Sequence, residues 1–173
     1  MLKKLILTAA IIVTVAGGCE DKSPPVPEAA APSGLPATLR LAAAPVDAKG
    51  VAEARSSATA GSRVTIRGVV GGRREPIAEG RALLTLLDLS VKTCDKTPGD
   101  ACATPWDACC EPKELLVKNS LTVQVVDPEG RPLRASLTQV PGVKPLATLV
   151  VTGTVASASA DSIAINADGI FVE

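Results

Sequence analysis

The sequence contains no histidine and no tyrosine, and it has only one tryptophan and one phenylalanine among its 173 residues. The lack of histidine removes the most common general base and metal ligand, and it excludes catalysis by Ser–His and Cys–His pairs. With so few aromatic side chains, a hydrophobic core has to be built from Val, Leu, Ile and Ala. A site that binds single-stranded nucleic acid by stacking bases on aromatic rings is also not expected.

Neither sign of charge is in excess, and the sequence shows no recognisable arrangement of catalytic residues. Lys and Arg together number 18, as do Asp and Glu, so the formal net charge is +0. Such a chain has no global field that would steer it toward nucleic acid or acidic lipid. The acidic residues of segment 88–107 lie in a turn-rich region, where carboxylates usually face water. We therefore predict that the protein is not an enzyme and has no cofactor.

Residues 1–19 show the order of segments found in an export signal. Two lysines precede an apolar run at 5–16, which is too short to span a membrane and is followed by two glycines and Cys19. The sequence AGGC at 16–19 resembles a bacterial lipobox, although Ala16 stands where leucine is usual. The resemblance implies lipidation of Cys19, and an anchor in the bacterial cell envelope on the extracytoplasmic side of a membrane. The alternative is an ordinary signal peptide cleaved beside a free cysteine.

The signal is followed by a segment that is unlike a folded domain. Residues 20–45 are rich in Pro and Ala, a composition that favours extended, solvated chain and predicts a tether. Residues 46–61 are expected to contain a short helix that leads into the first strand, with Asp47 as its candidate cap. The tether would give the following domain reach from the membrane.

Segments of alternating apolar and polar residues predict five β-strands in the region 62–173. They lie at 62–70, 82–91, 121–126, 146–155 and 163–172. Gly68 inside the first segment indicates a bend, and the Pro and Gly of 127–130 indicate a β-turn. Residues 112–119 are expected to form one helical turn. Five strands without a long helix are typical of a small all-β barrel or sandwich.

Four short stretches of the sequence resemble exported bacterial proteins with an OB-fold. They are VAEAR at 51–55, VTIRGVV at 64–70, VVTGTV at 150–155 and IAINA at 163–167. The resemblance implies an all-β fold, a small five-stranded OB-fold-like Greek-key barrel with a short N-terminal helix. A cysteine-rich insertion at 92–120 would separate strands two and three. Within it, TPWDACCEP at 104–112 is similar to a TPWD-x-CCEP motif of uncharacterised bacterial lipoproteins, which implies no activity.

The insertion carries four cysteines with the spacing C-x7-C-x6-C-C, namely Cys94, Cys102, Cys109 and Cys110. Because thiols oxidise outside the cytoplasm, we predict two structural disulfides. A bond between the adjacent pair is disfavoured by their short Cα separation, so two pairings remain open. They are Cys94–Cys109 with Cys102–Cys110, and Cys94–Cys110 with Cys102–Cys109. The alternatives are a metal site, although no C-x2-4-C knuckle is present, and a thiol-redox centre, although there is no C-x-x-C motif. The spacing therefore predicts no metal ligands.

OB-folds usually bind ligands through the face of strands two and three and through the loops between strands one and two and between strands four and five. In this sequence those elements are 82–91, 121–126, 71–80 and 156–161. Candidate ligand-binding residues are Arg73, Arg74 and Trp106, although exposed arginines are often only solvated and the indole could instead cover the sulfurs.

We predict a membrane-anchored binding or interaction module. Its partners would be the membrane, through the N-terminal lipid, and a glycan, peptide or protein ligand, whereas nucleic acid is not expected. The sequence carries no signal for an oligomeric state. The alternative function is that of a metal-binding or thiol-redox protein that uses the cysteines.

Overall fold

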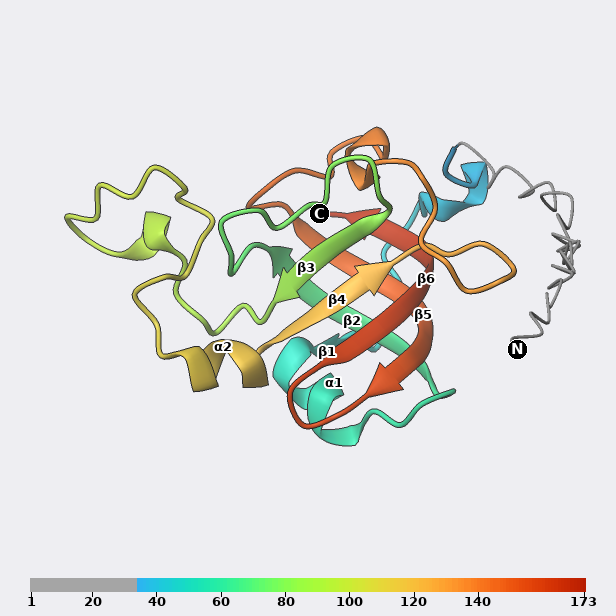
Figure 1. Ribbon diagram of the computed structural model, residues 1–173, viewed down its shortest axis with the longest axis horizontal. Coiled ribbons are helices and arrows are strands. Elements are labelled where there is room, and N and C mark those ends of the chain that lie inside the picture. Colours follow the sequence, from blue (N-terminus) through green and yellow to red (C-terminus); the bar gives the residue numbers. More distant parts are fainter. Residues whose placement is uncertain (1–33) are drawn as a thin grey trace, which may run out of the picture.

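The alternating segments of the sequence form strands that belong to one closed sheet (Figure 1). The computed structural model describes residues 34–173, so the predicted signal, Cys19 and most of the predicted tether lie outside the described residues. The strands are β1 (Lys49–Gly50), β2 (Arg63–Val70), β3 (Leu83–Leu87), β4 (Ser120–Gln124), β5 (Thr148–Ala158) and β6 (Ile163–Val172). The α-helices are α1 (Val51–Ser57) and α2 (Lys113–Lys118), and the 3-10 turns are η1 (Ala37–Leu39), η2 (Cys94–Lys96) and η3 (Leu137–Gln139).

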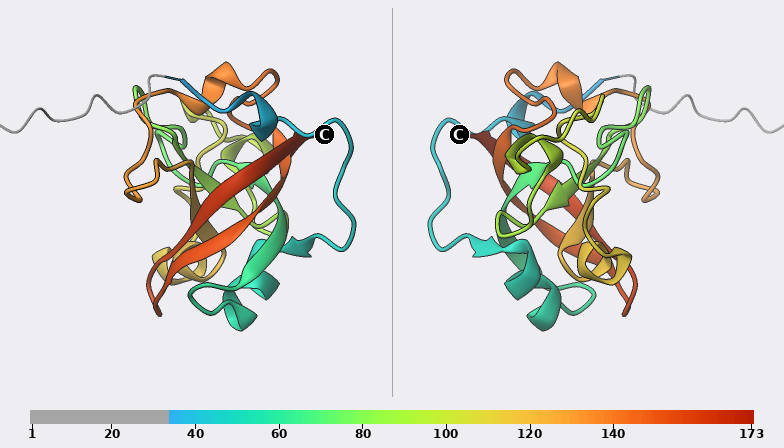
Figure 2. Two further views of the ribbon diagram at one scale, coloured as in Figure 1. Left: turned by 90° about the vertical axis from the view of Figure 1, so that its right-hand side faces the viewer. Right: turned by 90° about the vertical axis from the view of Figure 1, so that its left-hand side faces the viewer.

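Five of these strands close into a barrel, which confirms the predicted all-β, OB-fold-like architecture. Strand β2 pairs antiparallel with β5 and with β3, β3 pairs with β4, β4 runs parallel to β6, and β6 pairs with β5. Two further views show β5 and β6 crossing the barrel wall side by side (Figure 2). The short strand β1 adds to β2 from outside the ring. The cysteine-rich insertion lies between β3 and β4, where the sequence predicted it.

Strand β2 changes its partner from β5 to β3 directly after Gly68. Its pairing with β5 ends at Val69, where its pairing with β3 begins. A Cβ atom at Gly68 would lie 2.7 Å from the carbonyl oxygen of Leu87, so only glycine lets the two backbones approach this closely. The glycine that indicated a bend therefore lies where the barrel closes.

The core is aliphatic, as the shortage of aromatic residues required. Inward-facing side chains from all five barrel strands and from α1 meet in one cluster, which includes Val51, Ile66, Leu86, Val123, Val151 and Ile165. None of the buried hydrophobic residues within 34–173 is aromatic. Because side chains alternate across a strand, neighbours such as Thr85 and Thr122 face outward.

Part of the segment that we predicted as tether packs on the barrel. Leu39 is only 1% exposed, and the Leu41 N–H donates to the Ile170 carbonyl at 2.9 Å. Three leucines interrupt the Pro and Ala at 35–41, and the averaged composition of the longer segment concealed them. No helix within the described part of the chain is long and apolar enough to cross a membrane.

The short helix forms within the predicted range, but Asp47 does not cap it. Helix α1 begins at Val51, and Asp47 has a left-handed φ of 58° and lies outside the helix. The Ala52 N–H instead donates to the Asp88 carboxylate at 2.9 Å, across 36 residues of chain. The helix is therefore capped from the end of strand β3.

Three further elements can be compared with their predicted positions. The strand predicted at 82–91 ends at Leu87, because the chain turns at Asp88. In this turn, the Asp88 carboxylate accepts the Ser90 N–H, and the Asp88 carbonyl accepts the Val91 N–H. The predicted β-turn at 127–130 is confirmed by a hydrogen bond from the Gly130 N–H to the Asp127 carbonyl at 2.9 Å. The expected helical turn at 112–119 is α2.

Candidate functional site

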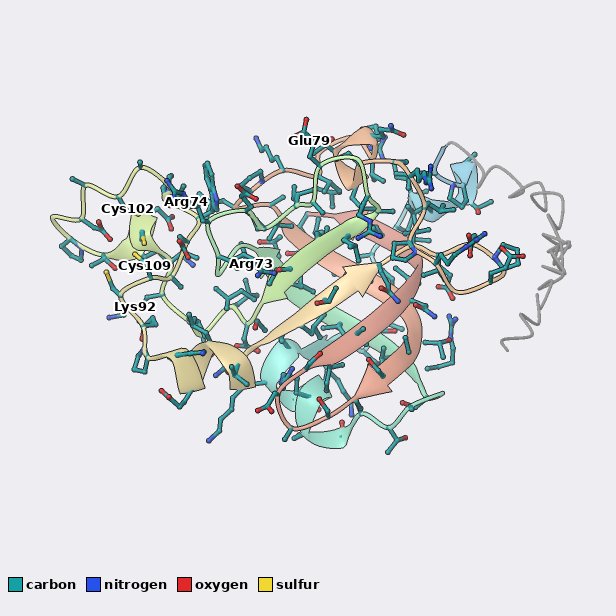
Figure 3. All side chains as sticks on the ribbon, viewed as in Figure 1. Arg73, Arg74, Glu79, Lys92, Cys102 and Cys109 are labelled. Carbon is teal, nitrogen blue, oxygen red and sulfur yellow. The ribbon has the colours of Figure 1, made fainter. Side chains whose placement is uncertain are left out.

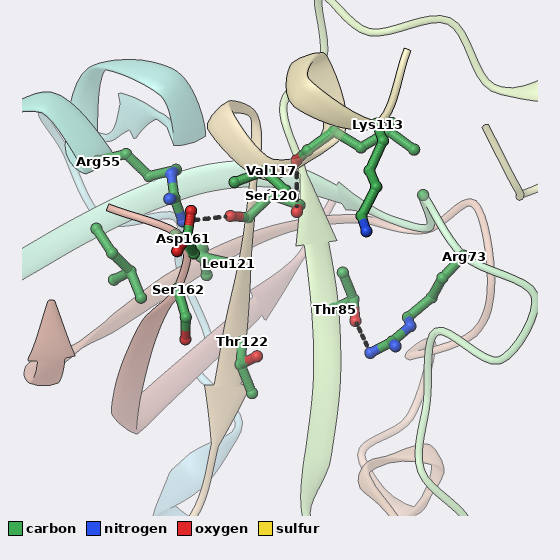
Figure 4. A pocket seen from close by; sticks show the side chains of 13 residues that line it. Arg55, Arg73, Thr85, Lys113, Val117, Ser120, Leu121, Thr122, Asp161 and Ser162 are labelled. Carbon is green, nitrogen blue, oxygen red and sulfur yellow. Dashed lines mark hydrogen bonds between the residues drawn. The ribbon is translucent and has the colours of Figure 1, made fainter. Parts of the chain in front are cut away.

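A cleft of about 260 Å³ lies over the outward-facing side of strands β3 and β4 (Figure 4). Its floor includes Thr85 of β3 and Thr122 of β4, which are direct partners in the strand register. The walls come from the 71–80 loop, from α2, from α1 and from the turn between β5 and β6. These are the face and the two loops at which the resemblance predicted a ligand site, together with part of the insertion.

Three cationic side chains and one carboxylate line the cleft, namely Arg55, Arg73, Lys113 and Asp161. Arg73 and Lys113 are exposed and point toward the same space beside Thr85 (Figure 4). Arg73 Nη1 donates to Thr85 Oγ1 at 3.5 Å, a long and therefore weak hydrogen bond. Within residues 34–173, neither of these two cations forms a salt bridge. Their charges are thus available to a bound anion.

Arg55 has a different role, because its guanidinium is already bound to the protein. Nη1 donates to the Ser120 carbonyl at 2.8 Å and Nη2 to the Ala160 carbonyl at 3.1 Å. Burial lowers the pKa of Arg55, and the nearby Asp161 carboxylate partly opposes this effect. Arg55 therefore ties α1 to β4 and to the β5–β6 turn, and so fixes one wall of the cleft.

The predicted ligand-binding residues separate into two groups. Arg73 lines the cleft, whereas Arg74 and Trp106 are not among the lining residues. Trp106 is partly buried, and its Nε1–H donates to the Arg74 carbonyl at 3.0 Å. In the opposite direction, the Gly72 N–H donates to the Trp106 carbonyl at 2.9 Å. Trp106 thus fastens the insertion to the 71–80 loop.

The sequence did not single out Thr85, Thr122, Lys113 or Asp161 as site residues. Strand alternation could have placed the two threonines on the outer face, because each lies between buried apolar neighbours. The position of Lys113 depends on how the insertion returns to the barrel, and no local pattern reports that path.

The insertion is attached to the barrel through a second, smaller apolar cluster. Val91 and Ala108, both buried, pack with Val69 of β2 and Leu87 of β3. Backbone hydrogen bonds join the two sides of the insertion: the Cys94 N–H donates to the Asp107 carbonyl at 2.7 Å, and the Asp95 N–H to the Pro105 carbonyl at 2.9 Å. These contacts bring together cysteines that are distant in the sequence.

Cys94, Cys102, Cys109 and Cys110 form a cluster within the insertion, without a disulfide bond between any two of them. The Cys94 and Cys109 Sγ atoms are 3.6 Å apart, and these two and Cys102 Sγ all lie within 4.8 Å of one another. Figure 3 shows Cys102 and Cys109 in the insertion, away from Arg73 at the cleft. Cys110 Sγ is 3.8 Å from the Asp100 carboxylate. The predicted disulfides are not formed here and stay a prediction.

The thiols of the cluster differ in acidity. Burial, together with the hydrogen bond to Cys109, raises the pKa of the Cys94 thiol to about 12. The Thr104 hydroxyl, 3.4 Å from Cys102 Sγ, lowers the pKa of the Cys102 thiol. Cys94 therefore holds its proton firmly, whereas Cys102 is the thiol that ionises more readily.

No protein-family model, no curated protein and no solved structure gives a significant match to the chain. The function is therefore argued from the geometry of the cleft and of the cysteine cluster.

Proposed function

We propose that this protein is a lipid-anchored binding module of the bacterial cell envelope, and that its barrel binds a ligand carrying a carboxylate. In this proposal, lipidated Cys19 holds the chain at the membrane. The tether gives reach, and the cleft over β3 and β4 receives the ligand.

The observation that carries the proposal is the pair of cations without a salt-bridge partner over the threonine floor. Arg73 and Lys113 lie on separate elements, yet both point into the cleft, and within the described residues no carboxylate neutralises them. A guanidinium and an ammonium that point into one space favour an anionic group there. The hydroxyls of Thr85 and Thr122 provide hydrogen bonds beneath it.

The size of the cleft restricts the ligand. Its volume of about 260 Å³ is slightly below the range of about 300–1,000 Å³ that is typical of small-molecule sites. It therefore suits one acidic sugar unit of a glycan, or the terminal carboxylate of a peptide, rather than several sugar units or several peptide residues. The chemistry that these two ligands share is a carboxylate flanked by polar groups.

Binding is proposed rather than catalysis because the lining residues do not form a nucleophile–base pair. Among the described residues of the cleft, no hydroxyl donates a hydrogen bond to a carboxylate. The Ser120 hydroxyl donates to the Leu116 carbonyl, and the Thr85 hydroxyl accepts from Arg73. Without histidine, the candidate general bases that line the cleft within residues 34–173 are Asp161 and Lys113, and no lining hydroxyl forms a hydrogen bond to either of them.

The proposal is tested by calorimetric titration of the full chain with two pairs of probes. Glucuronate is compared with glucose, and a short peptide with a free C-terminal carboxylate is compared with its amide. We expect binding of at least one acid and of neither neutral counterpart. Binding of the sugar acid alone would indicate a glycan, and binding of the peptide acid alone would indicate a peptide terminus.

Adjacent arginines provide a matched pair of variants. Arg73→Gln should weaken binding of the acidic probe about tenfold or more, because a charge-assisted hydrogen bond contributes about 1.5–3 kcal/mol. Arg74→Gln removes the same charge one residue further along, outside the cleft lining, and should change the affinity less than twofold. Equal losses in the two variants, or no binding of either acid, would refute the proposal.

A further inference from the structure

The three sulfurs of Cys94, Cys102 and Cys109 have a spacing that suits a metal ion. In a tetrahedral zinc site with Zn–S distances of about 2.3 Å, neighbouring sulfurs are about 3.8 Å apart. A disulfide bond, in contrast, requires a separation of about 2.05 Å. The Cys94–Cys109 separation is 3.6 Å, and the whole triangle lies within 4.8 Å. The Cys94–Cys109 separation is thus nearer to that of a metal–thiolate site than to that of a disulfide.

We propose that Cys94, Cys102 and Cys109 bind one thiophilic divalent cation, such as Zn²⁺, as thiolates. A fourth coordination position would face solvent, because Cys109 is exposed at the surface of the insertion. This site is separate from the cleft and goes beyond the binding function proposed above. Three sulfur ligands would select a soft or borderline cation over Mg²⁺ or Ca²⁺.

The backbone of the insertion already holds the three ligands in place. Cys94 is fixed by its N–H bond to the Asp107 carbonyl at 2.7 Å, and Cys102 by its N–H bond to Asp100 Oδ1 at 2.8 Å. Cys109 directly follows Ala108, which is buried in the smaller apolar cluster. Ligands that are positioned before the cation arrives lose little conformational freedom on binding it.

Cys110 is not assigned as a ligand. A second group of candidate ligands joins its thiol and the Asp100 carboxylate to Cys94, but that group offers only two sulfurs. A thiophilic cation favours the set of three, and both sets cannot be used at once because they share Cys94. Cys110 thus serves as a matched control, since it lies next to a proposed ligand and carries the same chemical group.

Cation binding has a consequence for protons. A coordinating thiol must lose its proton, so each bound thiolate releases one proton to solvent. Protons and the cation compete for the same sulfurs, so the apparent affinity should rise as the pH is raised. The same cysteines cannot be oxidised in pairs while they bind the cation, so the cation site and the two predicted disulfides exclude each other.

The test uses the full chain, purified without metal, reduced and kept anaerobic. Native mass spectrometry after addition of Zn²⁺ should show one zinc per chain. Addition of Co²⁺ in its place should give the visible absorption of a tetrahedral cobalt–thiolate site. We expect Cys94→Ser and Cys109→Ser each to lower the zinc affinity about 100-fold or more.

Two control variants make the ligand assignment specific. Cys110→Ser and Cys19→Ser should each retain one zinc with an affinity within about threefold of the parent chain. Circular dichroism of every variant without metal should match that of the parent, which would separate loss of a ligand from loss of the fold. Binding of glucuronate or of the peptide acid is measured on the same variants, and it should be unaffected because the cleft lies elsewhere.

Three results would overturn the proposal. The first is a reduced chain that binds no Zn²⁺ at a large excess. The second is an equal loss of zinc in Cys110→Ser and Cys94→Ser. The third is native protein, isolated from cells with its thiols blocked at lysis, whose mass shows two disulfides and no metal. None of these results depends on the cleft, so they leave the proposed ligand binding to be judged separately.

Discussion

The carboxylate of Asp88 is predicted to be one of the most sensitive points of the fold. It is 8% exposed and lies just after strand β3. It accepts the Ala52 N–H at the start of helix α1 at 2.9 Å, as well as the Ser90 N–H at 3.0 Å and the Ser90 hydroxyl at 2.7 Å. One side chain thus joins α1 to the barrel and also closes the turn that leads into the insertion.

The expected cost of Asp88→Ala follows from these contacts. Loss of a helix cap costs about 1 kcal/mol, and a buried donor left without a partner costs about 1–3 kcal/mol, so we expect a loss of about 2–4 kcal/mol. Urea unfolding of the full chain, followed by circular dichroism, measures this loss. With an m-value of about 2 kcal/mol/M, the midpoint should fall by roughly 1–2 M while m stays constant.

A control variant and the pH dependence make the prediction specific. Glu79→Ala removes an exposed carboxylate from the 71–80 loop and should change the stability by less than about 0.5 kcal/mol.

Burial alone would raise the pKa of Asp88, but hydrogen bonds from Ala52, Ser90 and Val51 outweigh burial and hold the pKa below its ordinary value. The stabilisation is therefore complete above about pH 4 and is lost as the pH falls through the lowered pKa.

It follows that Asp88→Asn should flatten the dependence of stability on pH in that acid range. An Asp88→Ala variant as stable as Glu79→Ala, or an Asp88→Asn variant with an unchanged acid profile, would refute the reasoning.

Two other predictions concern barrel closure and the anchor. A Cβ atom at Gly153 of β5 would collide with the Asn166 carbonyl oxygen of β6, so Gly153→Ala should destabilise the chain by about 1–3 kcal/mol. The neighbouring substitution Thr154→Ala is the control, and it should cost less than about 1 kcal/mol in the same urea assay. Equal effects would mean that the two strands are not packed this tightly. Cys19→Ser should move the protein from the membrane fraction to the soluble fraction of bacterial cells, and continued sedimentation with membranes would contradict the proposed lipid anchor.

Much of the fold was predictable because the information is local. Alternation predicted all five barrel strands, and Gly68 marked the point at which β2 changes partner. The predicted strand extended beyond the end of β3 because the Asp88 carboxylate turns to accept the Ala52 N–H at the start of α1, 36 residues earlier in the chain. The alternation of apolar and polar residues carries no signal of that contact. Asp47 was chosen as the cap because it precedes the helix in the sequence, whereas the cap that forms comes from another strand.

The candidate site was predictable only in part. The resemblance to OB-folds located the face and the loops, and Arg73 does line the cleft there. Lys113 was missed because its position follows from the path of the insertion. The cysteine spacing favoured disulfides, which stay a prediction. It did not show which sulfurs lie within 4.8 Å of one another, because these meet only after the two sides of the insertion pair. Contacts of this kind depend on tertiary structure and leave no periodic pattern.

The most direct test of the account is a map of where an acidic ligand binds. Amide chemical shifts of the full chain, followed during titration with the acidic probe that binds, should change saturably at Arg73, Thr85 and Thr122 and should stay constant in the cysteine cluster. The same titration of Arg73→Gln should lose these changes. Shifts that centre on another face of the barrel, or that persist unchanged in Arg73→Gln, would contradict the central claim that this cleft is the ligand site.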